Sequence, residues 1–150
     1  MNEICENAEK FVDEMLNDFG YDFKVNAEWQ EDEGCLISLE GEDVSYALSE
    51  NGELLDAVET ILFQVYGREL ERHQRFVCDA DGFRQTRKAE LNAMAKFAAQ
   101  NVRKNGKPFT FGVLNSTERR VIHLYLKEQE DLISESIGTG RDRRLTVSLK

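Results

Sequence analysis

Arg119 and His123 are the two residues of this sequence whose types and spacing most directly suggest a chemical role. Residues four apart in an α-helix lie on one face, and the stretch around the pair, TERRVIHLYL, has the pattern of an amphipathic helix. At about 100° per residue, Arg120 and Lys127 fall in the same sector, with the apolar side chains opposite. Arginine can bind a phosphate through two N–H donors, and an imidazole can donate a hydrogen bond or stack on a base. The ordinary alternative is a solvated polar face without a ligand.

Other basic residues gather in the same half of the chain. Arg84, Arg87 and Lys88 are expected on the first turns of a long helix. The stretch GTGRDRR adds further arginines beside two glycines, whose backbone N–H groups could approach an anion. The same glycines are also explained by a hairpin turn that needs positive φ. These clusters weaken the solvated-face alternative without removing it.

The hydrophobic periodicity predicts the elements that must position these residues, and it favours an α+β protein. The first half reads α-β-β-α-β and the second half α-β-α-β-β. Asn115 and Glu118 resemble a capping box at the start of the second helix of the second half. The expected helices cover residues 2–19, 53–70, 84–105 and 117–127, and the expected strands cover 21–30, 35–41, 75–81, 109–114, 131–138 and 143–149. We therefore expect two modules, residues 1–81 and 82–150, each a small mixed sheet with helices on one face.

The net charge of −10 is unevenly divided along the 150 residues. Residues 1–80 hold 21 acidic and 5 basic residues, a balance of −16, whereas residues 81–150 hold 8 and 14, a balance of +6. Such an asymmetry suggests two modules with different partners. Only the second half has a charge that favours phosphate.

The cysteines and histidines do not form a pattern typical of a disulfide framework or a metal site. Cys5, Cys35 and Cys78 are odd in number and far apart, so we expect reduced thiols in the core. His73 and His123 are not spaced as a ligand pair, and we predict no metal and no cofactor.

Enzyme and targeting motifs are also missing from the sequence. It contains no phosphate-binding glycine loop and no nucleophile or metalloprotease motif, so we do not expect an enzyme. The N-terminus lacks the basic start and apolar centre of a secretory signal, and no apolar run approaches the roughly 20 residues of a membrane span. We expect a cytoplasmic protein without a membrane span.

Four stretches in register resemble the bacterial Jag family (the SpoIIIJ-associated protein), in which a KH domain precedes an R-3-H domain. They are NGELLDAVETI, CDADGFRQTRKAEL, NSTERRVIHLYL and SIGTGRDRRLTVSL, and the resemblance runs from about residue 35 to residue 149. The R-3-H domain is named for an Arg-x-x-x-His signature, which here is Arg119 to His123.

The resemblance implies a KH-like type II module at residues 1–81 and an R-3-H module at 82–150. It implies binding of single-stranded RNA, with DNA as an alternative, and a role in regulating gene expression or cell elongation and division. Arg119 and His123 would form the core of the site. Its electrostatic rim would comprise Arg120, Lys127, Arg84, Arg87, Lys88, Arg141, Arg143 and Arg144.

The KH-like half departs from its family at one loop. KH domains clamp the nucleic-acid backbone with a G-x-x-G loop at a helix N-terminus. The corresponding residues here are Ser49, Glu50, Asn51 and Gly52, a degenerate loop that lacks the first glycine and carries an acid where a base would help. We therefore expect that this half does not bind RNA in the usual way. The competing hypothesis is a protein-interaction adaptor that binds a partner through the acidic half.

Overall fold

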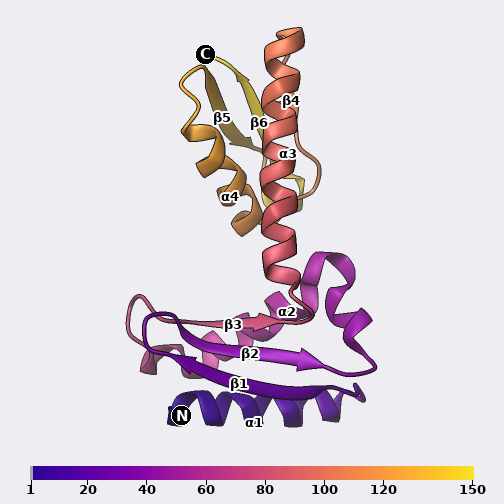
Figure 1. The fold of residues 1–150 in the computed structure, drawn as a ribbon, viewed down its shortest axis with the longest axis vertical. Helices are drawn as coiled ribbons and strands as arrows, with labels where there is room; N and C mark the ends of the chain where they lie inside the picture. Colours follow the sequence, from indigo (N-terminus) through magenta and orange to yellow (C-terminus); the bar gives the residue numbers. More distant parts are fainter. Residues whose placement is uncertain (1) are drawn as a thin grey trace. The chain divides into compact units, whose positions relative to one another are not determined.

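The computed structural model describes residues 2–150, which form two compact units (Figure 1). Unit 1 extends to Arg84, and unit 2 runs from Gln85 to Lys150. Each unit has one three-stranded sheet and its own hydrophobic core. The predicted α+β class is confirmed.

Unit 1 places two helices against one face of a mixed sheet. Its elements are α1 (Glu3–Asp18), β1 (Lys24–Gln30), β2 (Gly34–Glu40), α2 (Val44–Tyr66), the short 3₁₀ helix η1 (Gly67–Glu69) and β3 (Arg75–Asp79). The hairpin strands β1 and β2 are antiparallel, as predicted, and β2 pairs with β3 in parallel. Alternate residues of β2, Cys35, Ile37 and Leu39, are buried. They form one core with the apolar sides of α1 and α2.

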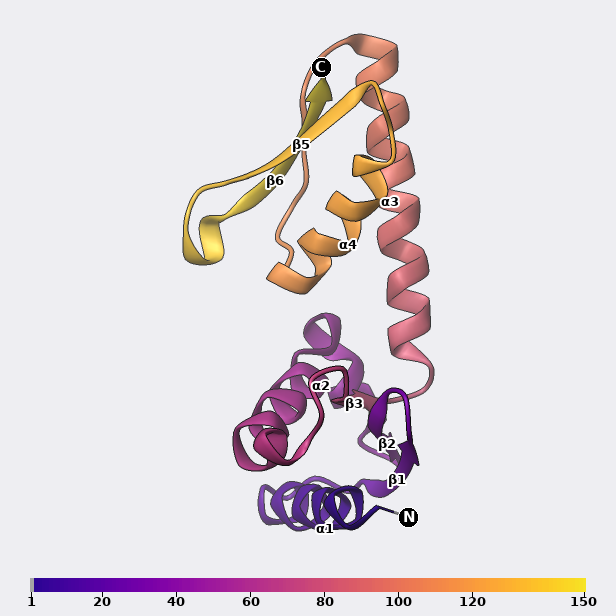
Figure 2. The ribbon, with the colours of Figure 1, turned by 90° about the vertical axis from the view of Figure 1, so that its left-hand side faces the viewer.

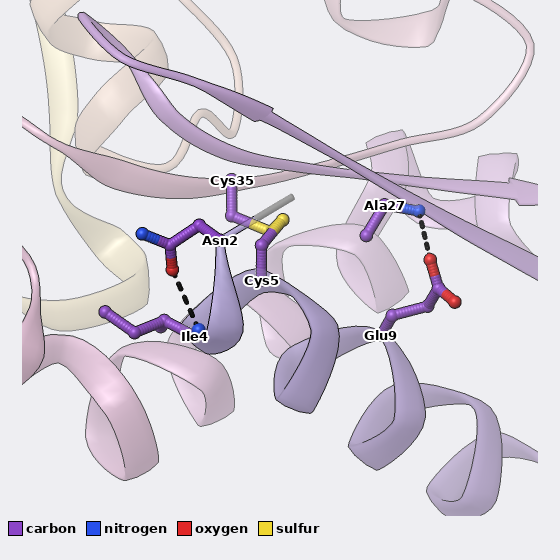
Figure 3. Close-up of a disulfide and its surroundings, with 6 residues drawn as sticks. All are labelled: Asn2, Ile4, Cys5, Glu9, Ala27 and Cys35. Carbon is purple, nitrogen blue, oxygen red and sulfur yellow. Dashed lines mark hydrogen bonds between the residues drawn. A yellow bond between two sulfur atoms is a disulfide. The ribbon is translucent and has the colours of Figure 1, made fainter.

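A disulfide joins α1 to the sheet, and it corrects the prediction of three reduced thiols. Cys5 on α1 and Cys35 on β2 are 30 residues apart in sequence, but packing of α1 on the sheet brings their Cα atoms to 5.5 Å (Figure 3). The helix is also held at the sheet edge by Glu9, whose carboxylate accepts a hydrogen bond from the Ala27 N–H at 2.7 Å. Sequence spacing could not reveal this pair, because the pairing depends on tertiary packing.

Cys78 is the cysteine for which the prediction of a reduced core thiol is correct. It is a buried free thiol on β3. Burial, reinforced by the negative charge of Glu59, raises the pKa of Cys78 to about 12. The thiol is therefore protonated at neutral pH and a poor nucleophile.

The degenerate loop interrupts α2. Ser49 is extended, and the next three residues, Glu50, Asn51 and Gly52, are left-handed, with φ of 52°, 55° and 77°. A Cβ atom on Gly52 would lie 2.5 Å from the ring of Phe83, so both the backbone angle and the available space require glycine there. The predicted helix 53–70 is thus the longer arm of α2, which ends at Tyr66. The preceding arm, residues 44–48, was not predicted.

Unit 2 also has its helices on one face of its sheet, seen beside β5 and β6 in Figure 2. Its elements are α3 (Phe83–Asn105), which begins at the end of unit 1, β4 (Phe109–Thr110), α4 (Ser116–Lys127), β5 (Leu132–Ile137), the 3₁₀ helix η2 (Gly140–Asp142) and β6 (Arg144–Leu149). The strand order is β4-β6-β5, and both pairings are antiparallel. The prediction of a mixed sheet is therefore wrong for this unit. The strand predicted at 109–114 is only two residues long.

Candidate nucleic-acid interface

The N-terminus of α4 is fixed by the predicted capping box. The Asn115 side chain accepts from the Glu118 N–H at 2.8 Å, and Glu118 accepts from the Asn115 N–H at 3.2 Å. Glu118 is only 8% exposed, and its second oxygen accepts from Arg87 Nε at 2.6 Å. These bonds set where the first turn of α4 begins.

An open pocket of about 290 Å³ lies beside α4, and it is lined by Ser116, Arg119, Arg120, His123, Ser136 and Arg143. The lining contains three guanidinium groups and one imidazole but no carboxylate. Two of the arginines and the histidine come from one helix face, as the helical spacing predicted. Arg143 reaches the same pocket from the segment between β5 and β6.

Backbone carbonyls hold two of these arginines in place. Arg119 Nη1 donates to the Leu114 carbonyl at 2.7 Å, and Arg143 Nη1 donates to the Gly138 carbonyl at 2.8 Å. A guanidinium has five N–H donors, so each keeps donors for a ligand. Within residues 2–150, Arg119, Arg120 and Arg143 form no salt bridge with a carboxylate.

His123 is held by the neighbouring strand. Its Nδ1 lies 2.6 Å from the hydroxyl oxygen of Ser134 on β5. The ring nitrogen that remains for a ligand in the pocket is Nε2. The pocket is therefore suited to an acceptor-rich anion such as a phosphate.

Two of the predicted rim arginines form salt bridges with carboxylates. Arg84 donates to Asp56 at 2.7 Å and to Glu59 at 2.6 Å within unit 1. Arg87 binds Glu118 and Glu90 in unit 2. Burial of Arg87 opposes its charge, but the hydrogen bonds that it donates to these two carboxylates outweigh burial and raise its pKa. Both guanidinium groups therefore hold the fold together.

The remaining rim residues lie outside the pocket lining. Lys88, Lys127 and Arg141 are exposed and form no salt bridge in the described part of the chain. Arg144 alternates with buried Leu145 on β6, so its side chain starts on the sheet face opposite the helices. The structure thus brings Arg119, Arg120, His123 and Arg143 together.

Three serines of this region were missed by sequence reasoning. Ser116 and Ser136 line the pocket, and Ser134 holds the imidazole. The alternation of β5 was a usable signal, since Ser134 and Ser136 share one face of that strand. Which strand face meets α4 depends on tertiary packing and was not available from periodicity.

None of the helices within residues 2–150 combines the length and apolar character needed to cross a bilayer. Over the same residues, no group of three or more His, Cys, Asp or Glu side chains is arranged to hold a metal ion.

Comparison with known proteins finds one domain family and two curated relatives that are similar to this chain. Residues 89–149, most of unit 2, match the R-3-H domain family. The chain is similar to the RNA-binding protein KhpB of Clostridium symbiosum, with 24% identity over 148 residues, or 98% of this chain and 67% of the relative. It is also similar to the RNA-binding protein KhpB of Bacillus subtilis (strain 168), with 28% identity over 114 residues, or 75% of this chain and 55% of the relative. The chain thus spans between about half and two thirds of the length of these relatives.

The matches support the R-3-H and Jag families named from the sequence motifs. The family match lies in unit 2, where the pocket is. The KH-like assignment of unit 1 stays a prediction.

Proposed function

We propose that this chain is a single-stranded RNA-binding protein of the Jag type, and that the pocket beside α4 binds the phosphate backbone. The observation that carries the proposal is the pocket lining itself, in which Arg119, Arg120 and Arg143 surround His123 without a carboxylate. Phosphate contacts of this kind supply a large share of the affinity in nucleic-acid binding. The similarity to two RNA-binding proteins supports RNA as the ligand.

Each residue of the pocket has a separate task in this proposal. Arg119, held by the Leu114 carbonyl, presents a pre-oriented guanidinium to one phosphate. Arg120 and Arg143 add positive charge to the same pocket. His123 donates a hydrogen bond through Nε2 or stacks on an unpaired base. Lys88, Lys127 and Arg141 are exposed, and their positive charge would attract the strand over a longer distance.

The test is a fluorescence titration of labelled single-stranded RNA, and of DNA of the same sequence, at two salt concentrations. We expect the Arg119→Ala/His123→Ala double variant to bind at least tenfold more weakly than wild type. We also expect its salt slope to fall by about 0.7, the value for one phosphate contact on a single strand.

Arg103→Ala is the matched control for the loss of one arginine from unit 2. Arg103 is exposed and bound to Asp131 by two hydrogen bonds of 2.7 Å, outside the pocket. We expect Arg103→Ala to retain near-wild-type affinity for RNA. Undetectable binding of wild type at low salt would refute the RNA proposal and favour the protein-interaction adaptor. Equal binding by wild type and the double variant would show that the RNA-binding site lies elsewhere in the chain.

The cytoplasm is the proposed location, as expected from the sequence. Disulfides are rare there because cytosolic thiol systems reduce them. In this chain Cys5 is 0% and Cys35 1% exposed, so the bond is shielded from such reductants. Fractionation of cells, with thiol labelling of the extracted protein, tests both the location and the state of the bond.

A regulatory role in gene expression or in cell elongation and division is the part of the proposal that rests on family resemblance alone. Crosslinking the protein to RNA in cells and sequencing the attached RNA tests it. Enrichment of transcripts for growth and division functions is the expected result.

A further inference from the structure

We propose that Ser134 is a positioning residue of the pocket: its hydroxyl donates to Nδ1 of His123, so that Nε2 carries the ring proton and presents it to a phosphate. The inference deepens the proposed function and rests on it.

The geometry ties the ring to the sheet. His123 lies on α4 and Ser134 on β5, the strand against which α4 packs, and the Nδ1–Oγ distance is 2.6 Å. Ser134 and Ser136 lie on the same face of β5, but Ser136 lines the pocket, whereas Ser134 is the residue bonded to the ring. The hydrogen bond to Ser134 on β5 therefore fixes the rotation of the imidazole ring, which is otherwise exposed.

The chemistry of the ligand decides the direction of this hydrogen bond. Phosphate oxygens in a nucleic-acid backbone accept hydrogen bonds but cannot donate them, so a ring nitrogen that contacts them must carry a proton. A neutral imidazole has one N–H donor and one acceptor. If Ser134 donates to Nδ1, the proton of the neutral ring must be on Nε2.

A serine hydroxyl is well suited to this position because it can both donate and accept. It donates to Nδ1 of the neutral ring and can accept from Nδ1–H if the ring becomes protonated. In both states Nε2–H remains available to the pocket. A carboxylate at the same place would accept only, and would hold the neutral ring as the Nδ1–H tautomer.

Nitrogen NMR of His123 in the free protein tests the positioning without any RNA. At alkaline pH, where imidazole rings are neutral, the ¹⁵N shifts of Nδ1 and Nε2 distinguish the two tautomers. We expect a protonated Nε2 and an unprotonated Nδ1 in wild type. A dominant Nδ1–H tautomer would show that Ser134 is the acceptor and would overturn the proposal.

Binding measurements test the consequence for RNA. We expect Ser134→Ala to weaken binding about fivefold, the size of one neutral hydrogen bond, and Ser134→Thr, which keeps the hydroxyl, to restore it. Ser148→Ala is the matched control, because Ser148 alternates with buried Val147 on β6 and lies on the sheet face away from α4. Ser148→Ala should leave affinity unchanged.

A double-mutant cycle separates positioning from a general effect on folding. If Ser134 acts through the imidazole, Ser134→Ala should cause no further loss in a His123→Ala background. An equal loss in both backgrounds, or no loss from Ser134→Ala in the wild-type background, would refute the proposal. Absence of RNA binding by wild type would refute the proposed function instead, and the tautomer would still decide whether Ser134 orients the ring as stated.

Discussion

At the scale of single residues, four arginines of unit 2 separate into two kinds by what lies beside them. Arg87 and Arg103 are paired with carboxylates, whereas Arg119 and Arg143 bond to backbone carbonyls and keep donors free. The residue type is the same in every case. The difference comes from long-range neighbours, since Glu118 lies 31 positions after Arg87 in the chain.

Arg87→Ala should therefore affect stability more than RNA binding. The substitution leaves the nearly buried carboxylate of Glu118 without its charged partner, and breaking such a pair costs about 3 kcal/mol. We expect urea unfolding to show a loss of this size, while RNA affinity at low salt falls far less than with Arg119→Ala.

Arg120→Ala is the control, because Arg120 is exposed and forms no salt bridge within residues 2–150. It should leave the unfolding midpoint unchanged and weaken RNA binding. A tenfold loss of RNA affinity in Arg87→Ala, with unchanged stability, would show that Arg87 belongs to the RNA-binding surface.

At the scale of elements, unit 1 depends on a crosslink between α1 and β2 and on a sharp break in α2. The crosslink closes a loop of 30 residues. The break consists of left-handed residues, and the ring of Phe83 leaves no space for a side chain at Gly52. Both features constrain the acidic unit rather than the pocket of unit 2.

Reduction of the Cys5–Cys35 disulfide should destabilise unit 1 by about 3.6 kcal/mol, the chain-entropy value for a 30-residue loop. Urea unfolding with and without a reductant measures this difference. The Cys5→Ser/Cys35→Ser variant should not respond to reductant.

Thiol titration of the unfolded protein without reductant gives a second readout of the same bond. It should detect one thiol per chain, that of Cys78. Detection of three thiols, or unfolding curves that are the same with and without reductant, would show that the bond does not form in solution.

Gly52→Ala should destabilise unit 1 by more than Gly82→Ala does. Both glycines are left-handed, with φ of 77° and 68°, so each substitution costs about 1 kcal/mol for the backbone. An added Cβ at Gly82 meets nothing within 4 Å, whereas at Gly52 it meets the Phe83 ring at 2.5 Å. We expect a further loss of about 1–3 kcal/mol from this overpacking, measured by urea unfolding. Equal losses would mean that the loop relaxes away from Phe83.

At the scale of the whole molecule, charge divides between the units. Residues 1–84 carry 22 acidic and 6 basic residues, a balance of −16, and residues 85–150 carry 7 and 13, a balance of +6. The pocket without carboxylates is in the positive unit, and the acidic loop with Glu50 is in the negative one. Of the two units, this division therefore favours unit 2 for the proposed binding of a phosphate backbone.

Substitutions of a charged residue in the two units should therefore have different effects on RNA affinity. Arg119→Ala should weaken binding about tenfold at low salt, whereas Glu50→Ala should leave it unchanged or strengthen it slightly, because removal of an acid reduces repulsion. Titrations at two salt concentrations measure both. A loss on Glu50→Ala would show that the degenerate loop contacts RNA, contrary to the expectation from its sequence.

Much of the architecture could be predicted because it depends on near neighbours. The order of helices and strands, the capping box of Asn115 and Glu118, and the shared face of Arg119 and His123 follow from local spacing, and the structure has all of them. The strand expected at 109–114 was overextended, because apolar residues alone do not show where pairing with β6 stops.

The sequence by itself determined which side chains share a helix or strand face, since the 3.6- and 2-residue periods are properties of the local backbone. Only the tertiary structure decided which faces meet. Packing brought Cys5 to Cys35, turned Ser134 toward His123, and paired Arg87 rather than Arg119 with a carboxylate. These contacts join residues between 11 and 31 positions apart. Their geometry is set by how helices lie on sheets, which no local period encodes.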